Sequence, residues 1–200
     1  LGASGVMVTP SKEPTPLLED RLVEYFAAVD DAISIPIVLQ DHPASTQVHM
    51  SVPTLARLIR EIPGIECVKL ESLPSPPRIA ALKDMMKRDG RSVSILTGLG
   101  ALYGAFDLMQ ETNGFMTGFA FPEVLKSMVQ DAHNKDYDAM FRTYQAWLPM
   151  MVYEQQPGLA VRKEIYRLRG LLDVGHVRHP GSNISATGIS GLEDLVKRTI

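Results

Sequence analysis

The sequence predicts an α/β fold with a parallel sheet, and two features of the chain indicate it. Short apolar runs bounded by glycine and proline have the length of β-strands, and stretches with apolar residues at helical spacing separate them. Parallel strands need a long crossover between them, and these helical stretches are long enough to supply one each. The pattern leaves two architectures open: an open doubly wound sheet, or part of an eight-stranded barrel, which needs about 250 residues.

Five strands are expected in the first part of the chain. They are predicted at 5–9, 35–40, 65–72, 93–97 and 115–119. The helices are predicted at 17–33, 51–62, 78–87, 101–111, 122–133, 136–153, 159–172 and 190–198. Residues 41–46 are expected to form a loop. The helices beyond residue 121 are expected to form an all-α addition to the sheet rather than a further strand–helix unit.

The composition excludes several classes of function. With 200 residues, 45% of them hydrophobic and 22% charged, the chain is long enough for one sizeable core. A net charge of −3 without a basic cluster argues against a nucleic-acid partner. No apolar run reaches the roughly 18 residues of a membrane helix. Cys67 is the only cysteine, so we expect no disulfide and a reducing, cytoplasmic location. Because the chain opens at Leu1 and enters a strand within a few residues, we expect that its beginning is missing.

Lys69 lies in the middle of the third predicted strand. Side chains alternate along a strand, so Cys67, Lys69 and Glu71 share one face while Val68 and Leu70 share the other. One interpretation is an edge strand with the lysine in water, where it also opposes aggregation. The other is a desolvated lysine that attacks carbonyl groups as a nucleophile. The predicted order of strands places this strand between two others, which favours the second interpretation.

Three glycines, Gly98, Gly100 and Gly104, follow the fourth strand and open a helix. Their spacing departs from the G-x-G-x-x-G fingerprint of dinucleotide-binding folds, and no acidic residue ends the next strand to hold a ribose. A tight turn whose backbone N–H groups face an anion is therefore the preferred interpretation.

Polar residues end the second strand, where α/β folds place their chemistry. Gln40 is the last strand residue and could hydrogen-bond a substrate. His42 follows it, as an acid–base group or as an ordinary solvated loop residue. His176 and His179 are three residues apart but have no obvious carboxylate partner, so they give little support to a metal site.

Together these segments resemble the dihydrodipicolinate synthase and N-acetylneuraminate lyase family of class I aldolases and dehydratases. The resemblance is carried in order by residues 5–10, 35–43, 67–71, 96–98 and 114–118. It implies a (β/α)8 TIM barrel with a C-terminal helical extension, whose first three βα units are absent from this chain. Residues 1–121 would supply barrel strands four to eight, and residues 122–200 the last barrel helix and the extension. The family's Gly-Thr-Thr segment, which holds the keto acid's carboxylate, would lie upstream of Leu1.

The chain also departs from the family's pattern. Gln40 stands where the family has a proton-relay tyrosine, and Ser11-Lys12 stands in place of a Tyr-Tyr pair. Ser45 takes the position of an arginine that dihydrodipicolinate synthases use. Residues 40–45 and 116–118 are more similar to the branch that contains 2-keto-3-deoxy-sugar-acid dehydratases, such as the L-2-keto-3-deoxyarabonate enzyme.

The resemblance implies a lyase, either an aldolase or a dehydratase, that forms a Schiff base between Lys69 and a 2-oxo acid such as pyruvate or a 2-keto-3-deoxy sugar acid. Gln40 would orient the substrate, and protons would move through water, through His42 or through the absent segment. The residues expected to line the substrate pocket are Thr97, Gly98 and Thr117. No metal or organic cofactor is implied, and the protein is expected to form a homo-oligomer, either a tetramer or a dimer.

Three alternatives stay open at this stage. The first is a condensation of the dihydrodipicolinate synthase type. The second is a catalytically inactive relative that binds a metabolite, since the relay tyrosine is replaced by Gln40. The third is a nucleotide-binding oxidoreductase, which the glycines after the fourth strand would serve.

Overall fold

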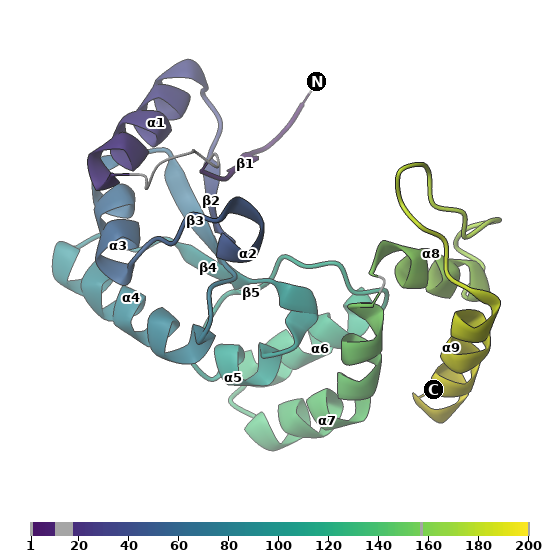
Figure 1. The fold of residues 1–200 in the computed structure, drawn as a ribbon. Helices are drawn as coiled ribbons and strands as arrows, with labels where there is room; N and C mark the ends of the chain where they lie inside the picture. Colours follow the sequence, from purple (N-terminus) through teal and green to yellow (C-terminus); the bar gives the residue numbers. More distant parts are fainter. Residues whose placement is uncertain (1, 11–17, 157, 200) are drawn as a thin grey trace. The chain divides into compact units, whose positions relative to one another are not determined.

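The chain forms two compact units. The computed structural model of the protein describes residues 2–10, 18–156 and 158–199 (Figure 1). Ser11-Lys12 and Leu17, the first residue of the first predicted helix, lie outside these ranges. The first unit, named the sheet unit, consists of residues 1–98 and 106–116, and the second, named the helical unit, of residues 99–105 and 117–200.

The sheet unit contains a five-stranded parallel sheet, as the sequence predicts. Its strands are β1 (Val6–Val8), β2 (Ile37–Asp41), β3 (Ile65–Leu70), β4 (Ser94–Thr97) and β5 (Gly114–Phe115). They lie side by side in the order in which they occur along the chain. A doubly wound sheet reverses its strand order at a switch point. The described strands show no such reversal.

Helices cover one face of this sheet (Figure 1). They are α1 (Glu19–Ala32), α3 (Val52–Glu61) and α4 (Ser75–Asp89). Alternate strand residues, including Leu39 and Val68, point to this face and are completely buried. The helices contribute Phe26, Leu58 and Leu82 to the same core. Burial of these side chains stabilises the unit by about 1.5–3 kcal/mol for each large aliphatic group.

Residues in the first turn determine where two helices of the sheet unit begin. The hydroxyl oxygen of Ser51 accepts the Thr54 N–H at 3.1 Å and so caps α3. Helix α4 begins at Ser75, three residues before its predicted start, because Pro76 and Pro77 occupy the first turn, where proline is tolerated.

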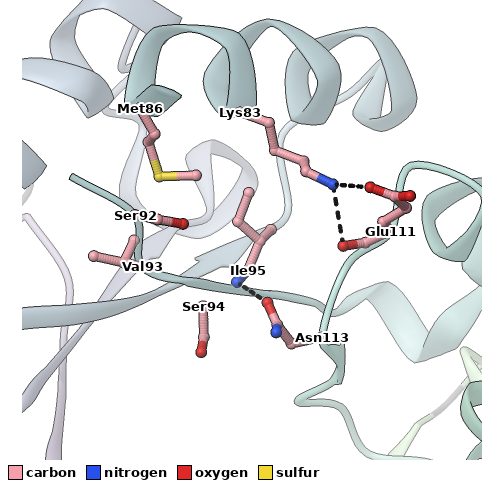
Figure 2. Close-up of a pocket in the computed structure, with 8 residues that line it drawn as sticks. All are labelled: Lys83, Met86, Ser92, Val93, Ser94, Ile95, Glu111 and Asn113. Carbon is pink, nitrogen blue, oxygen red and sulfur yellow. Dashed lines mark hydrogen bonds and ion pairs between the residues drawn. The ribbon is translucent and has the colours of Figure 1, made fainter. Parts of the chain in front are cut away.

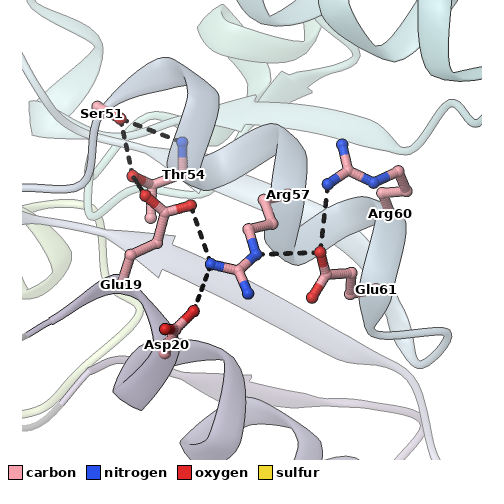
Figure 3. Close-up of polar contacts among 7 residues, drawn as sticks. All are labelled: Glu19, Asp20, Ser51, Thr54, Arg57, Arg60 and Glu61. Carbon is pink, nitrogen blue, oxygen red and sulfur yellow. Dashed lines mark hydrogen bonds and ion pairs between the residues drawn. The ribbon is translucent and has the colours of Figure 1, made fainter.

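An ion-pair network on the surface of the sheet unit joins its helices, and Figure 3 shows the part of it between α1 and α3. Arg57 on α3 pairs with Asp20 on α1 at 2.7 Å and with Glu61 in its own helix at 3.0 Å. Arg60, one turn along α3, pairs with Asp89 at the end of α4 at 3.2 Å. The network therefore links α1 to α4 through α3.

Three predictions of secondary structure are wrong in detail. The strand predicted at 115–119 is the two-residue β5 and ends at Phe115. Residues 41–46 are not entirely a loop, because Pro43–Thr46 form the short helix α2 and the Thr46 hydroxyl donates to the His42 carbonyl at 3.1 Å. The helix predicted at 101–111 is replaced by a 3-10 turn, η1 (Leu99–Ala101), and by α5 (Gly104–Leu108). All three residues of η1 have positive φ, between 51° and 66°, and this left-handed turn cannot continue as an α-helix.

The helical unit contains most of the later helices. They are α6 (Pro122–His133), α7 (Tyr137–Glu154), α8 (Leu159–Leu168) and α9 (Ala186–Thr199). Asp136 caps α7 by accepting the Ala139 N–H at 3.0 Å. Helix α8 ends at Leu168, before the predicted 172, because Gly170 turns the chain with a φ of 71°. No helix in the described ranges is long and apolar enough to cross a membrane.

Candidate active site

Lys69 lies near the carboxyl end of the central strand β3. It is in register with Gln40 on β2 and with Leu96 on β4, so an edge-strand position is excluded. Residues in register on parallel strands point to the same face. The neighbouring residues Leu39 and Val68 point to the helix-covered face, so Gln40 and Lys69 point to the opposite one.

Glu71 joins Lys69 and Gln40 into one polar group. The Lys69 ammonium nitrogen lies 3.1 Å from Oε2 of Glu71, and the Gln40 side-chain amide donates to the same oxygen at 2.7 Å. The Lys69 side chain is 13% exposed and that of Glu71 is 7% exposed. A charge this far from water requires a close opposite charge, which each of the two residues provides for the other.

Two contacts with Asp41 fix the turn that carries Glu71. The backbone N–H of Glu71 donates to the Asp41 carbonyl at 2.9 Å, which extends the pairing of β2 and β3 by one residue. The Ser72 hydroxyl donates to the Asp41 carboxylate at 2.6 Å, and Arg78 on α4 contacts the same oxygen at 3.1 Å. Burial raises the pKa of Asp41, while Ser72 and Arg78 act in the opposite direction. The position of Glu71 beside Lys69 is therefore anchored from the helix-covered side of the sheet.

Gly98 lies directly after β4 and packs against the Glu71 side chain. A Cβ atom at this position would come within 2.0 Å of Glu71 Oε1 and 2.4 Å of its carboxyl carbon. Only glycine leaves room for the carboxylate where it lies. The sequence predicts Gly98 as a pocket residue, and the structure brings it together with Lys69 through Glu71.

Glu71 is the residue that sequence reasoning missed as a functional group. The signal was present, since Glu71 shares a strand face with Lys69 two residues earlier. The contact also depends on Gln40 and Gly98, which are distant along the chain and are brought there by the register of β2 and β4.

His42 follows β2 and begins α2. Its ring nitrogen Nδ1 lies 2.8 Å from the Ser45 hydroxyl, and the Ser45 hydroxyl also donates to the His42 carbonyl at 3.2 Å. The His42 ring therefore contacts a residue of the same turn, Ser45. The acid–base role predicted for His42 stays a prediction.

Thr97 does not share the face of Lys69. It follows Leu96 directly in β4, and its side chain is 2% exposed beside Asp107 and Ser75. Burial raises the pKa of Asp107 to about 6, and the hydroxyl groups of Ser75 and Thr97 nearby partly offset this shift. The hydroxyl of Thr97 is therefore directed to the helix-covered side and not to the Lys69 group.

Thr117 belongs to the helical unit. Its hydroxyl oxygen accepts the Gly100 N–H at 2.7 Å and thereby ties the segment after β5 to the left-handed turn η1. His176 is one of the two histidines that give little support to a metal site, and its carbonyl accepts a hydrogen bond from the Lys163 ammonium group. Across the described part of the chain, no group of three or more His, Cys, Asp or Glu side chains could hold a metal ion.

A hollow of about 320 Å³ lies at the amino end of β4, at the other end of the strand from Gly98 (Figure 2). Lys83 on α4 pairs there with Glu111 at 2.9 Å, and its ammonium group also donates to the Gln110 carbonyl at 2.9 Å. The Asn113 side-chain oxygen accepts the Ile95 N–H at 2.8 Å. These contacts connect α4 and β4 to the residues before β5, which is a structural use of the polar groups.

Comparison with known proteins places these features in a family. The chain is 33% identical over 184 residues to the L-2-keto-3-deoxyarabonate dehydratase of Azospirillum brasilense, a match that covers 90% of this chain and 58% of the relative. It is 32% identical to the dihydrodipicolinate synthase of Rhodopseudomonas palustris in its crystal structure, with a TM-score of 0.91 over 98% of this chain and 66% of the other. The chain belongs to the dihydrodipicolinate synthase family. The family predicted from the sequence is thus confirmed.

Other comparisons agree with this family assignment. The 4-hydroxy-tetrahydrodipicolinate synthase of Aquifex aeolicus is 30% identical over 143 residues, which are 68% of this chain and 45% of that relative. The chain therefore spans about half the length of the curated relatives it matches. No model of a known protein family matches the sequence.

Proposed function

We propose that the protein is a Schiff-base-forming lyase that acts on a 2-oxo acid. The observation that carries this proposal is the pairing of Lys69 with Glu71, 3.1 Å apart and largely shielded from water, at the carboxyl end of a parallel sheet. Similarity to a 2-keto-3-deoxy-sugar-acid dehydratase over 90% of the chain supports a substrate of that class.

The first step is imine formation at Lys69. The ammonium group must lose a proton before it can attack, and Oε2 of Glu71 is close enough to accept it. The free amine then adds to the C2 carbonyl carbon of the substrate. The carbonyl oxygen takes up two protons and leaves as water, so that a protonated imine remains on Lys69.

The second step uses the protonated imine as an electron sink. It acidifies C3, from which Glu71 can remove a proton to form an enamine. In a 2-keto-3-deoxy sugar acid, the enamine electrons then expel the C4 hydroxyl group, which leaves as water after protonation. Gln40 is neither an acid nor a base at neutral pH, and its amide instead holds the Glu71 carboxylate through the 2.7 Å hydrogen bond.

We also propose the architecture and the assembly in which this chemistry takes place. Residues 1–121 would supply strands four to eight of a (β/α)8 barrel, and residues 122–200 the last barrel helix and the helical extension. Sequential parallel strands and the match to two thirds of a solved synthase support this arrangement. A homo-oligomer in the cytoplasm, with a small 2-oxo acid as its partner, completes the proposal.

Turnover assays test the function. The protein, in the longest form that its gene encodes, is incubated with a 2-keto-3-deoxy sugar acid, and the products of dehydration and of C–C cleavage are measured separately. We expect dehydration in the wild type, none in Lys69→Ala, and wild-type rates in Lys83→Ala, a lysine of the same unit outside the proposed site. Condensation of pyruvate with an aldehyde, in place of dehydration, would favour the synthase activity. Binding without turnover that survives Lys69→Ala would reveal an inactive relative and refute the proposal.

A further inference from the structure

The turn after β3, residues 71–74, is joined to Asp41 at the end of β2 through two consecutive residues. The Glu71 N–H donates to the Asp41 carbonyl at 2.9 Å, and the Ser72 hydroxyl donates to Oδ2 of Asp41 at 2.6 Å. Asp41 is in register with the core residue Leu70, so its carboxylate lies on the helix-covered side of the sheet, opposite to Lys69. Asp41 therefore holds the turn without entering the polar group around Lys69.

Arg78 on α4 adds a third contact to the same carboxylate. Its Nη2 donates at 3.1 Å to Oδ2 of Asp41, the oxygen that Ser72 also contacts, and at 2.8 Å to the Met50 carbonyl. Met50 lies just before α3, so one guanidinium group connects the two ends of the segment 41–50. Oδ1 of Asp41 has no hydrogen-bond partner among the described residues. The position of the carboxylate therefore depends on Ser72 and Arg78.

Asp41 and Arg78 form an ion pair that is largely buried. The side chain of Arg78 is 20% exposed, and that of Asp41 is not exposed at all. A charge removed from water in this way needs a close opposite charge or several donors. Without the guanidinium group, the Asp41 carboxylate would keep the Ser72 hydroxyl as a donor but lose its ion pair, and it would have to move. Because Asp41 holds residues 71 and 72, the turn would move with it.

We propose that Arg78 and Ser72 are positioning residues: through Asp41 they hold the Glu71 carboxylate where it can take a proton from Lys69. The inference rests on the proposed function, because it requires imine formation at Lys69. All five residues belong to the sheet unit. A general base must lie within hydrogen-bond distance of the proton that it removes, and Oε2 of Glu71 lies 3.1 Å from the Lys69 nitrogen. Misplacement by about 1 Å can slow a reaction by about 100-fold.

Kinetics of Ser72→Ala, Arg78→Lys and Arg78→Ala test the proposal. The protein, in the longest form that its gene encodes, is assayed for kcat and KM with a 2-keto-3-deoxy sugar acid, and for the rate of borohydride-trappable imine formation with pyruvate. We expect kcat and the trapping rate to fall together, by about 3- to 10-fold in Ser72→Ala and by about 10- to 100-fold in Arg78→Ala. Arg78→Lys should lie between the wild type and Arg78→Ala, because it keeps the charge but not the planar fork.

The substrate affinity and two matched controls separate positioning from general loss of structure. KM should stay within about twofold of the wild type in all three variants, because the Asp41 contacts lie on the other side of the sheet from the imine. Arg91→Ala is the control for Arg78→Ala, since Arg91 also donates to backbone carbonyls, including that of Ile65 at 2.7 Å, but at the amino end of β3. Ser51→Ala, which removes the cap of α3, is the control for Ser72→Ala. Both controls should lower the urea midpoint and leave kcat unchanged.

Double variants show whether the two residues act through Glu71. Since Glu71→Gln already removes the base, Ser72→Ala and Arg78→Ala should slow the Glu71→Gln enzyme by less than about twofold. The inference would be overturned by kcat values within about twofold of the wild type in Ser72→Ala and Arg78→Lys, or by equal losses with and without Glu71→Gln. Absence of a trapped adduct in the wild type would instead overturn the proposed function on which it rests.

Discussion

The change Asp107→Asn is expected to stabilise the protein, and to do so only above a defined pH. Asp107 on α5 is 4% exposed, with the hydroxyl groups of Ser75 and Thr97 beside it. Burial penalises the charged carboxylate more strongly than these two groups favour it, and the pKa is raised from 3.8 to about 6. Asparagine has nearly the same shape and is polar like the aspartate, but it carries no charge.

The size of the effect follows from the two pKa values. The folded protein binds the Asp107 proton more tightly than the unfolded chain does, so stability falls as the pH rises from about 4 to about 6 and then stays level. A shift of about 2 units corresponds to about 3 kcal/mol, at about 1.4 kcal/mol per unit. Below pH 4 the carboxyl group is neutral in both states and the penalty is absent.

Urea denaturation of the wild type and of Asp107→Asn at a series of pH values measures this. Asp41 and Glu154 also have a raised pKa, but both are present in the two proteins, so their effects on stability cancel in the difference. We expect the variant to be more stable by about 1–3 kcal/mol at pH 7.5, and by less than about 0.5 kcal/mol at pH 4. A difference that is the same at both pH values would refute the claim that burial raises the pKa of Asp107.

Two predictions concern the proposed catalytic group. Glu71→Gln should lower kcat by about 100-fold or more, the usual loss when a general base is removed, with an unchanged circular dichroism spectrum; a loss below threefold would mean that another group moves the protons. Gly98→Ala should displace the Glu71 carboxylate, because the new Cβ would lie 2.0 Å from Oε1, and should lower kcat far more than it lowers the urea midpoint. If Gly98→Ala slows the Glu71→Gln enzyme as strongly as it slows the wild type, Gly98 does not act through Glu71.

The sequence predicted the sheet well because its strands are short apolar runs between glycine and proline, a signal that is local. The placement of Lys69 between two strands followed from their order. Thr97 was expected to line the pocket beside Gly98, although the alternation of side chains along a strand already sets it apart from Leu96. Leu96 and Thr97 are adjacent in β4, so they point to opposite faces, and the register with Lys69 decides which one shares its side.

Other features depend on contacts that are distant along the chain. Leu99 and Ala101 adopt left-handed backbone conformations that their residue types disfavour, and tertiary contacts such as that of Gly100 with Thr117 hold this turn. Glu71 became a site residue only when Gly98 and Gln40 were placed around it. Such residues have ordinary surroundings in the sequence, and their role arises from the fold.

Borohydride trapping followed by peptide mass mapping tests the central claim most directly. The protein, in the longest form that its gene encodes, is reduced in the presence of pyruvate and digested. The account predicts a single pyruvate-derived adduct on the peptide that contains Lys69, and none in Lys69→Arg. An adduct on another lysine, or an unmodified Lys69 peptide in an enzyme that still turns over its substrate, would contradict it.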